Sequence, residues 1–204
     1  MKLHILYLIN FFLYQDISNT ENNQLFLDFF RHVGNTLQSL NIQNSFLSDN
    51  DLKIIFLNCC YLECLKMSNC PDIYLTSKLL QDKDNEMHLI QKSMPSLSEL
   101  YLDDNLSYIT DMSVEKLLKF VTKLRTLSLA GTSVSFHPGT YHRYYPRGSE
   151  NEDASNLVLT FNQVLSHIIK NSTSINHLDF SKTNFNDKAA LVLSQVNICA
   201  PKMN

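Results

Sequence analysis

The stretch "YITDMSVEKLLKFVTKLRTLSLAGTSV" (108–134) holds apolar residues at two different spacings. From Ile109 to Val121 they recur every three to four residues, which is the spacing of one face of a helix. From Leu124 the spacing tightens to Leu127 and Leu129, which is typical of a strand with one buried face. The change of period indicates that a helix is followed directly by a strand within this stretch.

The strand pattern Leu-x-x-Leu-x-Leu recurs along the chain, with apolar residues at its three defining positions. Its six copies begin at Leu3, Leu37, Leu62, Leu97, Leu124 and Ile175. Ahead of the third copy, Leu52, Ile55 and Cys59 form the apolar face of a helix, and the same offsets recur before other copies. Repeats of one helix and one strand are typical of proteins in which each repeat buries its apolar face against the next. The sequence therefore predicts a single α/β domain, residues 1–204, of about six helix–strand repeats.

A polar column accompanies the repeat. Eight positions after the start of each copy stand Phe11, Ser45, Cys70, Asn105, Thr132 and Thr183. Four of these six are Cys, Asn or Thr, whose side chains can hydrogen-bond a turning backbone. We therefore expect Asn105 to be buried, although it begins an Asn-Leu-Ser glycosylation triplet.

Two segments, "LSDNDLKIIFLNCCYLECLKMSNCPDI" (47–73) and "ITDMSVEKLLKFVTKLRTLSLAGTSV" (109–134), resemble the cysteine-containing leucine-rich repeat. The matches include Leu52, Ile55, Cys59, Leu62, Leu65, Met67 and Cys70 in the first, and Val114, Leu117, Val121, Leu124, Leu127 and Leu129 in the second. The resemblance implies a leucine-rich-repeat solenoid of the ribonuclease-inhibitor type, with parallel strands on the concave face and helices on the convex face. The family's glycine is replaced by Asp51 and Ser113, and residues 74–92 and 136–156 fall outside the pattern.

This subclass of repeat is typical of F-box/LRR proteins, the substrate receptors of SCF-type ubiquitin ligases. The resemblance implies a protein-binding module that presents a substrate for ubiquitination and is not itself an enzyme. No F-box is visible in the chain, so we expect the SCF adaptor as a partner only if an F-box lies upstream of Met1. The alternative is a stand-alone leucine-rich-repeat scaffold or regulator without a link to a ligase.

Candidate binding residues follow from the alternation of side chains along the strands. The apolar positions point into the core, so the residues between and just after them are expected on the concave surface. There they are predicted to bind protein: Tyr7, Asn41, Gln43, Lys66, Glu99, Tyr101, Asp103, Asp104, Ser128, His177, Asp179 and Lys182. The inserted loop 136–156 adds His142, Arg143, Tyr144 and Tyr145. That loop is interpreted as a surface insertion or a protein contact, with nucleic-acid binding through its Arg and aromatic residues as a third reading.

Other classes of function lack their signatures. The net charge of −3 and pI near 6.1 give no general attraction to nucleic acid or anionic membrane. No Cys-x-x-Cys pair, calcium loop, phosphate-binding glycine loop or nucleophile motif is present, so neither metal nor cofactor is expected. Five cysteines, an odd number, favour a reduced cytoplasmic or nuclear setting. The apolar start "MKLHILYLINFFLYQ" is too short to span a bilayer and is interpreted as the first repeat strand, with a targeting segment as the alternative.

Overall fold

The chain of 204 residues is described here by a computed structural model. The structure describes residues 3–10, 20–71, 94–105, 111–119, 121–132, 164–165, 168, 174–183 and 185–194. The segment 74–92 and the inserted loop 136–156, with the four residues predicted there to bind protein, lie outside the described residues.

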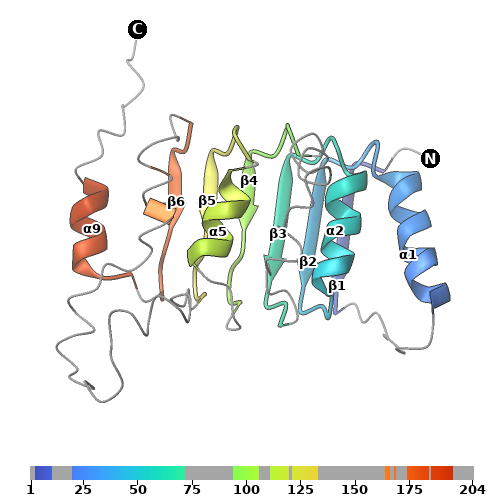
Figure 1. Cartoon of the computed structure of the whole chain (residues 1–204), viewed down its shortest axis with the longest axis horizontal. Helices are drawn as coiled ribbons and strands as arrows, with labels where there is room; N and C mark the ends of the chain where they lie inside the picture. The colour runs from blue at the N-terminus through green and yellow to red at the C-terminus, as the bar shows by residue number, and fades with distance from the viewer. Residues whose placement is uncertain are drawn as a thin grey trace, which may run out of the picture.

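Six strands form one sheet, in which every neighbouring pair is parallel (Figure 1). In spatial and chain order they are β1 (Ile5–Ile9), β2 (Ser39–Gln43), β3 (Cys64–Ser68), β4 (Glu99–Tyr101), β5 (Thr126–Ser128) and β6 (His177–Asp179). The middle apolar residue of each copy falls in one row across the sheet: Leu6, Leu40, Leu65, Leu100, Leu127 and Leu178. The six strands predicted from the repeat are confirmed.

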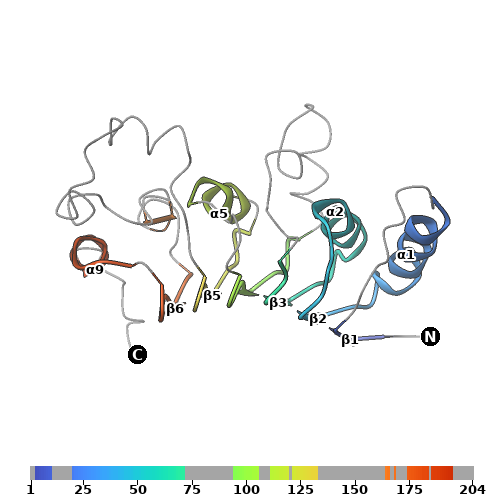
Figure 2. The ribbon, with the colours of Figure 1, turned by 90° about the horizontal axis from the view of Figure 1, so that it is seen from below.

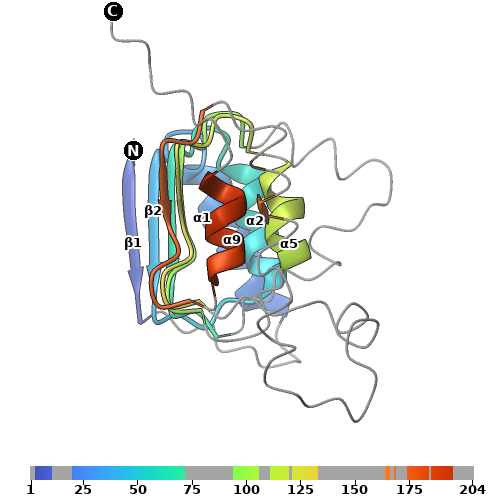
Figure 3. The ribbon, with the colours of Figure 1, turned by 90° about the vertical axis from the view of Figure 1, so that its left-hand side faces the viewer.

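The described helices all lie on one face of the sheet, as Figure 2 and Figure 3 show. They are α1 (Thr20–Val33), α2 (Asp49–Asn58), α5 (Asp111–Leu118) and α9 (Asp187–Ser194). Seen along the strands, the sheet curves gently, and its helix-free face is the inner side of the curve (Figure 2). The predicted arrangement of parallel strands on one side and helices on the other is confirmed as an α/β architecture.

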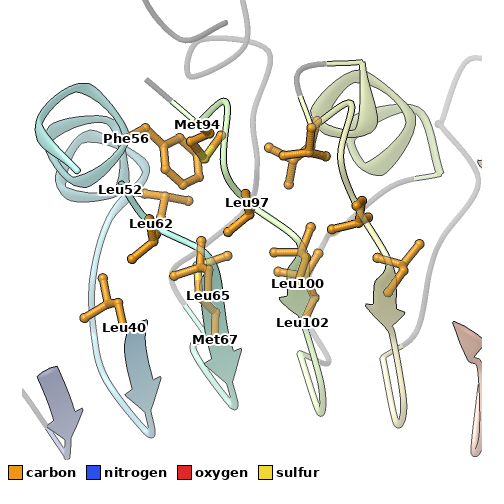
Figure 4. Packing of buried hydrophobic residues seen from close by; sticks show 14 of the residues in the cluster. Leu40, Leu52, Phe56, Leu62, Leu65, Met67, Met94, Leu97, Leu100 and Leu102 are labelled. Carbon is orange, nitrogen blue, oxygen red and sulfur yellow. The ribbon is translucent and has the colours of Figure 1, made fainter. Parts of the chain in front are cut away.

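The core lies between the sheet and the helices and is built from the apolar repeat positions. In Figure 4, Leu65 and Met67 of β3, Leu100 of β4 and Leu102 just after β4 point toward the helix layer. Leu52 of α2 approaches from that layer, and all five side chains are fully buried. Burying one leucine-sized side chain stabilises the fold by about 1.5–3 kcal/mol, so a row of such positions holds each repeat to the next.

After each strand the chain turns through a residue with a positive φ angle. These residues are Asn10, Asn44, Asn69, Asp104, Gly131 and Lys182, with φ between 50° and 66°. Gly, Asn and Asp adopt this left-handed conformation most readily, which explains the composition of the first five positions. This series of positive-φ residues was not predicted from the sequence. Its signal was a repeated Asn or Asp directly before the residues of the polar column.

The polar column tied to the repeat forms a ladder of hydrogen bonds to the preceding strand. The Ser45 hydroxyl donates to the carbonyl oxygen of Leu8 at 3.0 Å, and the Cys70 thiol lies 3.7 Å from that of Ile42. Asn105 Nδ2 donates to the carbonyl of Met67 at 2.7 Å, and the Thr132 hydroxyl donates to that of Leu102. Four successive turns are therefore tied to the strand before them, which confirms the predicted role of this column and the burial of Asn105.

The start of α2 explains why the glycine of the repeat pattern is replaced by Asp51. The Ser48 backbone N–H donates to Asp51 Oδ2 at 2.8 Å, and the Asp51 N–H donates to the Ser48 hydroxyl at 3.4 Å. This reciprocal capping box satisfies two backbone groups at the helix start. The Asp51 carboxylate is buried, and its Oδ2 accepts from both the backbone N–H and the hydroxyl of Ser48.

Within the apolar N-terminal run, residues Ile5–Ile9 form a strand. Ile5–Ile9 pairs with Ser39–Gln43 over five residues, and Leu6 and Leu8 pack against the core. Among the described helices, none is long and apolar enough to cross a membrane.

A candidate protein-binding surface

The face of the sheet opposite the helices, called the open face here, carries the side chains that alternate with the core positions. Strands β2 and β3 show the alternation most clearly, because every second residue is fully buried and those between are partly exposed. The register sets the open-face residues in rows that run across the strands. The central row contains Tyr7, Asn41, Lys66, Tyr101, Ser128 and Asp179.

At the middle of the open face, three predicted residues form one cluster. Lys66 Nζ lies 4.5 Å from the centre of the Tyr101 ring, a cation–π contact. The Tyr101 hydroxyl donates to Glu99 Oε2 at 3.2 Å. Burial, and then the neighbouring Glu99 carboxylate, raise the pKa of the Tyr101 phenol, so it stays a neutral donor. The cluster holds the aromatic ring in a fixed orientation on the surface.

Toward the N-terminal edge the open face becomes less charged. On β2 it presents Asn41 and Gln43, and Asn41 Oδ1 is buried without a hydrogen-bond partner among the described residues. On β1 it presents Ile5, Tyr7 and Ile9, each more than half exposed, with Tyr7 at 63%. These three side chains form an apolar strip, defined as Ile5, Tyr7 and Ile9, along the edge of the sheet.

Toward the C-terminal edge the open face is acidic. Asp103 Oδ1 accepts hydrogen bonds from the Ser128 hydroxyl at 2.5 Å and from the Ala130 N–H at 3.2 Å. Burial raises the pKa of Asp103; these two hydrogen bonds partly offset that rise, and the carboxylates of Asp179 and Asp104 add smaller increases. Asp179 accepts from the N–H of Ser181 at 2.9 Å, and that bond lowers its own pKa. The acidic end is defined as Glu99, Asp103, Asp104 and Asp179. Within it, Asp104 and Asp179 lie close enough to Asp103 for their carboxylates to repel its charge.

The structure places most of the predicted residues on the strands of this surface, and the exceptions are Asp104, Lys182 and Ser128. Asp104 and Lys182 stand in the turns that follow β4 and β6 and are exposed there. Ser128 was predicted to be exposed for binding, which is wrong, because its side chain is only 3% exposed and is held by Asp103. His177 is exposed at the start of β6. The cation–π pair was not foreseen, because Lys66 and Tyr101 are 35 residues apart and only the register aligns them.

The surface offers hydrogen-bonding, aromatic and charged contacts but no arrangement for catalysis by metal. Among the described residues, no three His, Cys, Asp or Glu side chains are grouped so that they could hold a metal ion. Cys64 lies on the open face beside Glu99, and burial together with that carboxylate raises the pKa of its thiol. A thiol with a raised pKa is a poor nucleophile at neutral pH.

Substitution of Asp103 by Asn is expected to stabilise the protein at neutral pH. Because the folded-state pKa of Asp103 is raised, its contribution to stability is greatest in acid and is lost as the pH rises through that pKa. The amide oxygen of Asn can accept the same two hydrogen bonds without the buried charge. We expect Asp103→Asn to raise the melting temperature by about 1–4 °C at pH 7 and by almost nothing near pH 3. Thermal unfolding followed by circular dichroism at both pH values measures this, and a lower melting temperature at pH 7 would contradict it.

Native-state alkylation of the cysteines tests the core. Burial raises the pKa of the Cys59 thiol to about 12 and that of Cys70 above its usual range, and both side chains are fully buried. Cys60 and Cys64 are partly exposed. We expect iodoacetamide to modify Cys60 first and Cys64 more slowly, because the pKa of the Cys64 thiol is raised, with both modified before unfolding. Cys59 and Cys70 are expected to react only at the rate of global unfolding. Peptide mass spectrometry resolves the sites, and early labelling of Cys59 or Cys70 would show that the core opens locally.

Comparisons with known proteins support the fold. No family model and no curated protein matches the sequence. Among solved structures, the tropomodulin C-terminal domain of Caenorhabditis elegans is similar. The match covers 85% of this chain and 89% of the tropomodulin chain, with a TM-score of 0.51 and 13% sequence identity. At that identity the likeness concerns the fold alone. Together with the six-stranded parallel sheet, it shows that the chain has an α/β fold of the leucine-rich-repeat type.

Proposed function

We propose that the protein is a protein-binding module, a leucine-rich-repeat solenoid whose open face contacts the partner. The observation that carries the proposal is the cluster of Lys66, Glu99 and Tyr101 at the centre of this face. The helices of the described chain lie on the other side of the sheet and leave this surface uncovered (Figure 3). A tyrosine already fixed by two neighbours loses little side-chain entropy on binding, which favours it as an anchor.

The polar composition of the open face also fits binding better than a purely structural role. Asn41 Oδ1 has no hydrogen-bond partner among the described residues, so a donor from a partner would satisfy a group that the fold leaves unpaired. The neighbouring Tyr7 and Gln43 offer an aromatic ring and an amide beside it. Nothing in this arrangement supports turnover, and we propose that the protein is not an enzyme.

We further propose that the module recognises substrates for an SCF-type ubiquitin ligase. Support comes from the match to the cysteine-containing repeat, in which Cys59 and Cys70 occupy pattern positions and pack in the core. This role requires an F-box in the protein, upstream of Met1, and a reducing compartment suits the free thiols. A stand-alone scaffold of the same fold is the alternative.

Affinity purification from cell lysate with matched variants tests the proposal. The open-face variant is Lys66→Ala/Tyr101→Ala. The control is Lys119→Ala/Tyr61→Ala, which removes the same residue types from exposed positions just after α5 and in the turn before β3. We expect partners to be lost, by about tenfold or more, from the open-face variant only. Partners retained by both variants would contradict the proposal.

The same experiment separates the ligase receptor from a scaffold. The protein is expressed from its full-length transcript, and the recovered proteins are blotted for the SCF adaptor. Recovery of the adaptor together with partners that depend on Lys66 and Tyr101 supports substrate recognition. Recovery of such partners without the adaptor supports the scaffold.

A further inference from the structure

The two ends of the open face differ in chemistry, and this difference indicates the kind of partner that the face fits. Its N-terminal edge is the apolar strip on β1, and its C-terminal half, β4 to β6 with the turns that follow, bears the acidic end. Against the four carboxylates of Glu99, Asp103, Asp104 and Asp179, that half presents one lysine, Lys182, and the exposed imidazole of His177 near Asp179. On β1 to β3 the only charged open-face side chain is Lys66, which is engaged with Tyr101.

Mutual repulsion makes the acidic end receptive to cations. The Asp103 carboxylate is held in place by Ser128 and Ala130, and its pKa is raised in part by Asp104 and Asp179. A guanidinium or ammonium group placed among these carboxylates would relieve that repulsion, while an anionic group would increase it. Charge complementarity therefore favours a basic segment at this end of the surface.

The apolar strip selects a different feature of the same partner. Ile5, Tyr7 and Ile9 project side by side from one strand, each more than half exposed, and form a contiguous apolar surface at the edge of the sheet. Covering such side chains with an apolar residue of a partner removes apolar area from water, which favours binding. The strip therefore favours an uncharged, aliphatic or aromatic anchor.

Combining these features, we propose that the partner is a protein segment that crosses the open face from β1 to β6, with an apolar anchor on Ile5, Tyr7 and Ile9 and arginine or lysine side chains among the carboxylates of β4 to β6. This inference rests on the proposed protein-binding function. Neighbouring strands lie about 4.8 Å apart, so the anchor and the first cation are separated by roughly 14 Å. An extended segment covers that distance in about four or five residues.

A second copy of the chain fits this surface poorly. Two open faces related by a two-fold axis parallel to the strands would set the acidic end of one against the apolar strip of the other. A two-fold axis across the strands would set carboxylates against carboxylates, which is costly. The first arrangement opposes unlike chemistry and the second opposes like charges, so the surface favours a different protein over self-association.

Selection from a random twelve-residue peptide library displayed on phage tests the partner's chemistry on the intact chain. We expect enriched peptides to carry an apolar pair, a spacer of about four residues and at least two Arg or Lys, with few Asp or Glu. Enrichment of acidic or uncharged peptides that still depend on Lys66 and Tyr101 would overturn this inference but leave the proposed function standing. Peptides whose binding is unchanged in Lys66→Ala/Tyr101→Ala, or no enrichment at all, would contradict both.

Variants then assign each half of the segment to its end of the surface. We expect Asp103→Asn/Asp179→Asn to weaken a selected peptide about three- to tenfold, and Arg→Gln replacement in the peptide to remove most of that difference. Tyr7→Ser is expected to weaken the same peptide without changing its salt dependence. Asp103→Asn is expected to stabilise the fold and Asp179→Asn to destabilise it, because their pKa values are shifted in opposite directions. Thermal unfolding of the double variant, and binding by Asp103→Asn alone, therefore separate weaker binding from unfolding. Equal binding by wild type and the double Asn variant would overturn the charge assignment, and concentration-dependent dimerisation through the open face would replace the partner by a second copy.

Discussion

Replacement of Gly34 by alanine is expected to destabilise the protein by about 3 kcal/mol or more. Gly34 follows α1, and its N–H donates to the Phe30 carbonyl at 2.8 Å. A Cβ atom at this position would lie 2.2 Å from the carbonyl oxygen of Asn58 and 2.5 Å from that of Phe30. Both neighbours are backbone atoms, so no side chain can rotate away, and the end of α1 would have to separate from the end of α2.

Urea unfolding of Gly34→Ala measures this effect, with Asn35→Ala as the matched control. Asn35 is the next residue and is exposed, so its truncation is expected to change the unfolding free energy by about 0.5 kcal/mol or less. Similar stability of the two variants would show that α1 and α2 do not approach each other as closely as described. Loss of the cooperative transition in Gly34→Ala alone agrees with the expectation.

Truncation of Asn105 to alanine is expected to cost about 2–5 kcal/mol. The side chain, 1% exposed, accepts from the Cys70 N–H at 2.8 Å and donates to the Met67 carbonyl at 2.7 Å. Alanine would leave both of these backbone groups without the partner that this side chain provides. The repeat that contains β3 and the repeat that contains β4 would lose the hydrogen bonds that join them at the turn.

Thermal and urea unfolding of Asn105→Ala measures the loss, and Asn176→Ala serves as the control. Asn176 is exposed just before β6, so the same substitution there is expected to have a small effect. An unfolding free energy for Asn105→Ala within about 0.5 kcal/mol of wild type would contradict the ladder as a source of stability.

The fold was largely predictable because the same apolar strand pattern occurs six times in the sequence. Leu40, Leu65, Leu100 and Leu127 occupy identical positions in their copies, and the structure aligns them in one row of the core. The polar column was likewise visible, since a Cys, Asn or Thr at a fixed offset has few roles other than bonding a turn. Its Ser45 member was the less expected one, and it makes the same bond as the others.

The candidate site was predictable only in outline. Alternation along a strand tells which side chains face away from the core, but not which of them meet across strands. The contact of Lys66 with Tyr101 depends on the register between β3 and β4. The burial of Ser128 depends on the hydrogen bond that its hydroxyl donates to Asp103, two residues beyond β4. Such contacts arise from tertiary packing, which a single pattern does not encode.

The separation of core and surface explains how this fold can vary its binding without losing stability. The ladder and the apolar rows lie on the helix side of the sheet, while Lys66, Glu99 and Tyr101 lie on the other. Substitutions on the open face therefore change recognition with little effect on folding, and at Asp103 the two are expected to move in opposite directions.

Site-specific photo-crosslinking tests the central claim, that the open face binds protein, most directly. The photoreactive residue p-benzoylphenylalanine is placed at Gln43, on the open face but outside the Lys66–Glu99–Tyr101 cluster, or at Leu57, which is exposed on α2 on the opposite side of the sheet. Irradiation with a partner recovered by affinity purification should give a covalent adduct from position 43 and none from position 57. Adducts from position 57 alone would place the binding surface on the helices and contradict the account.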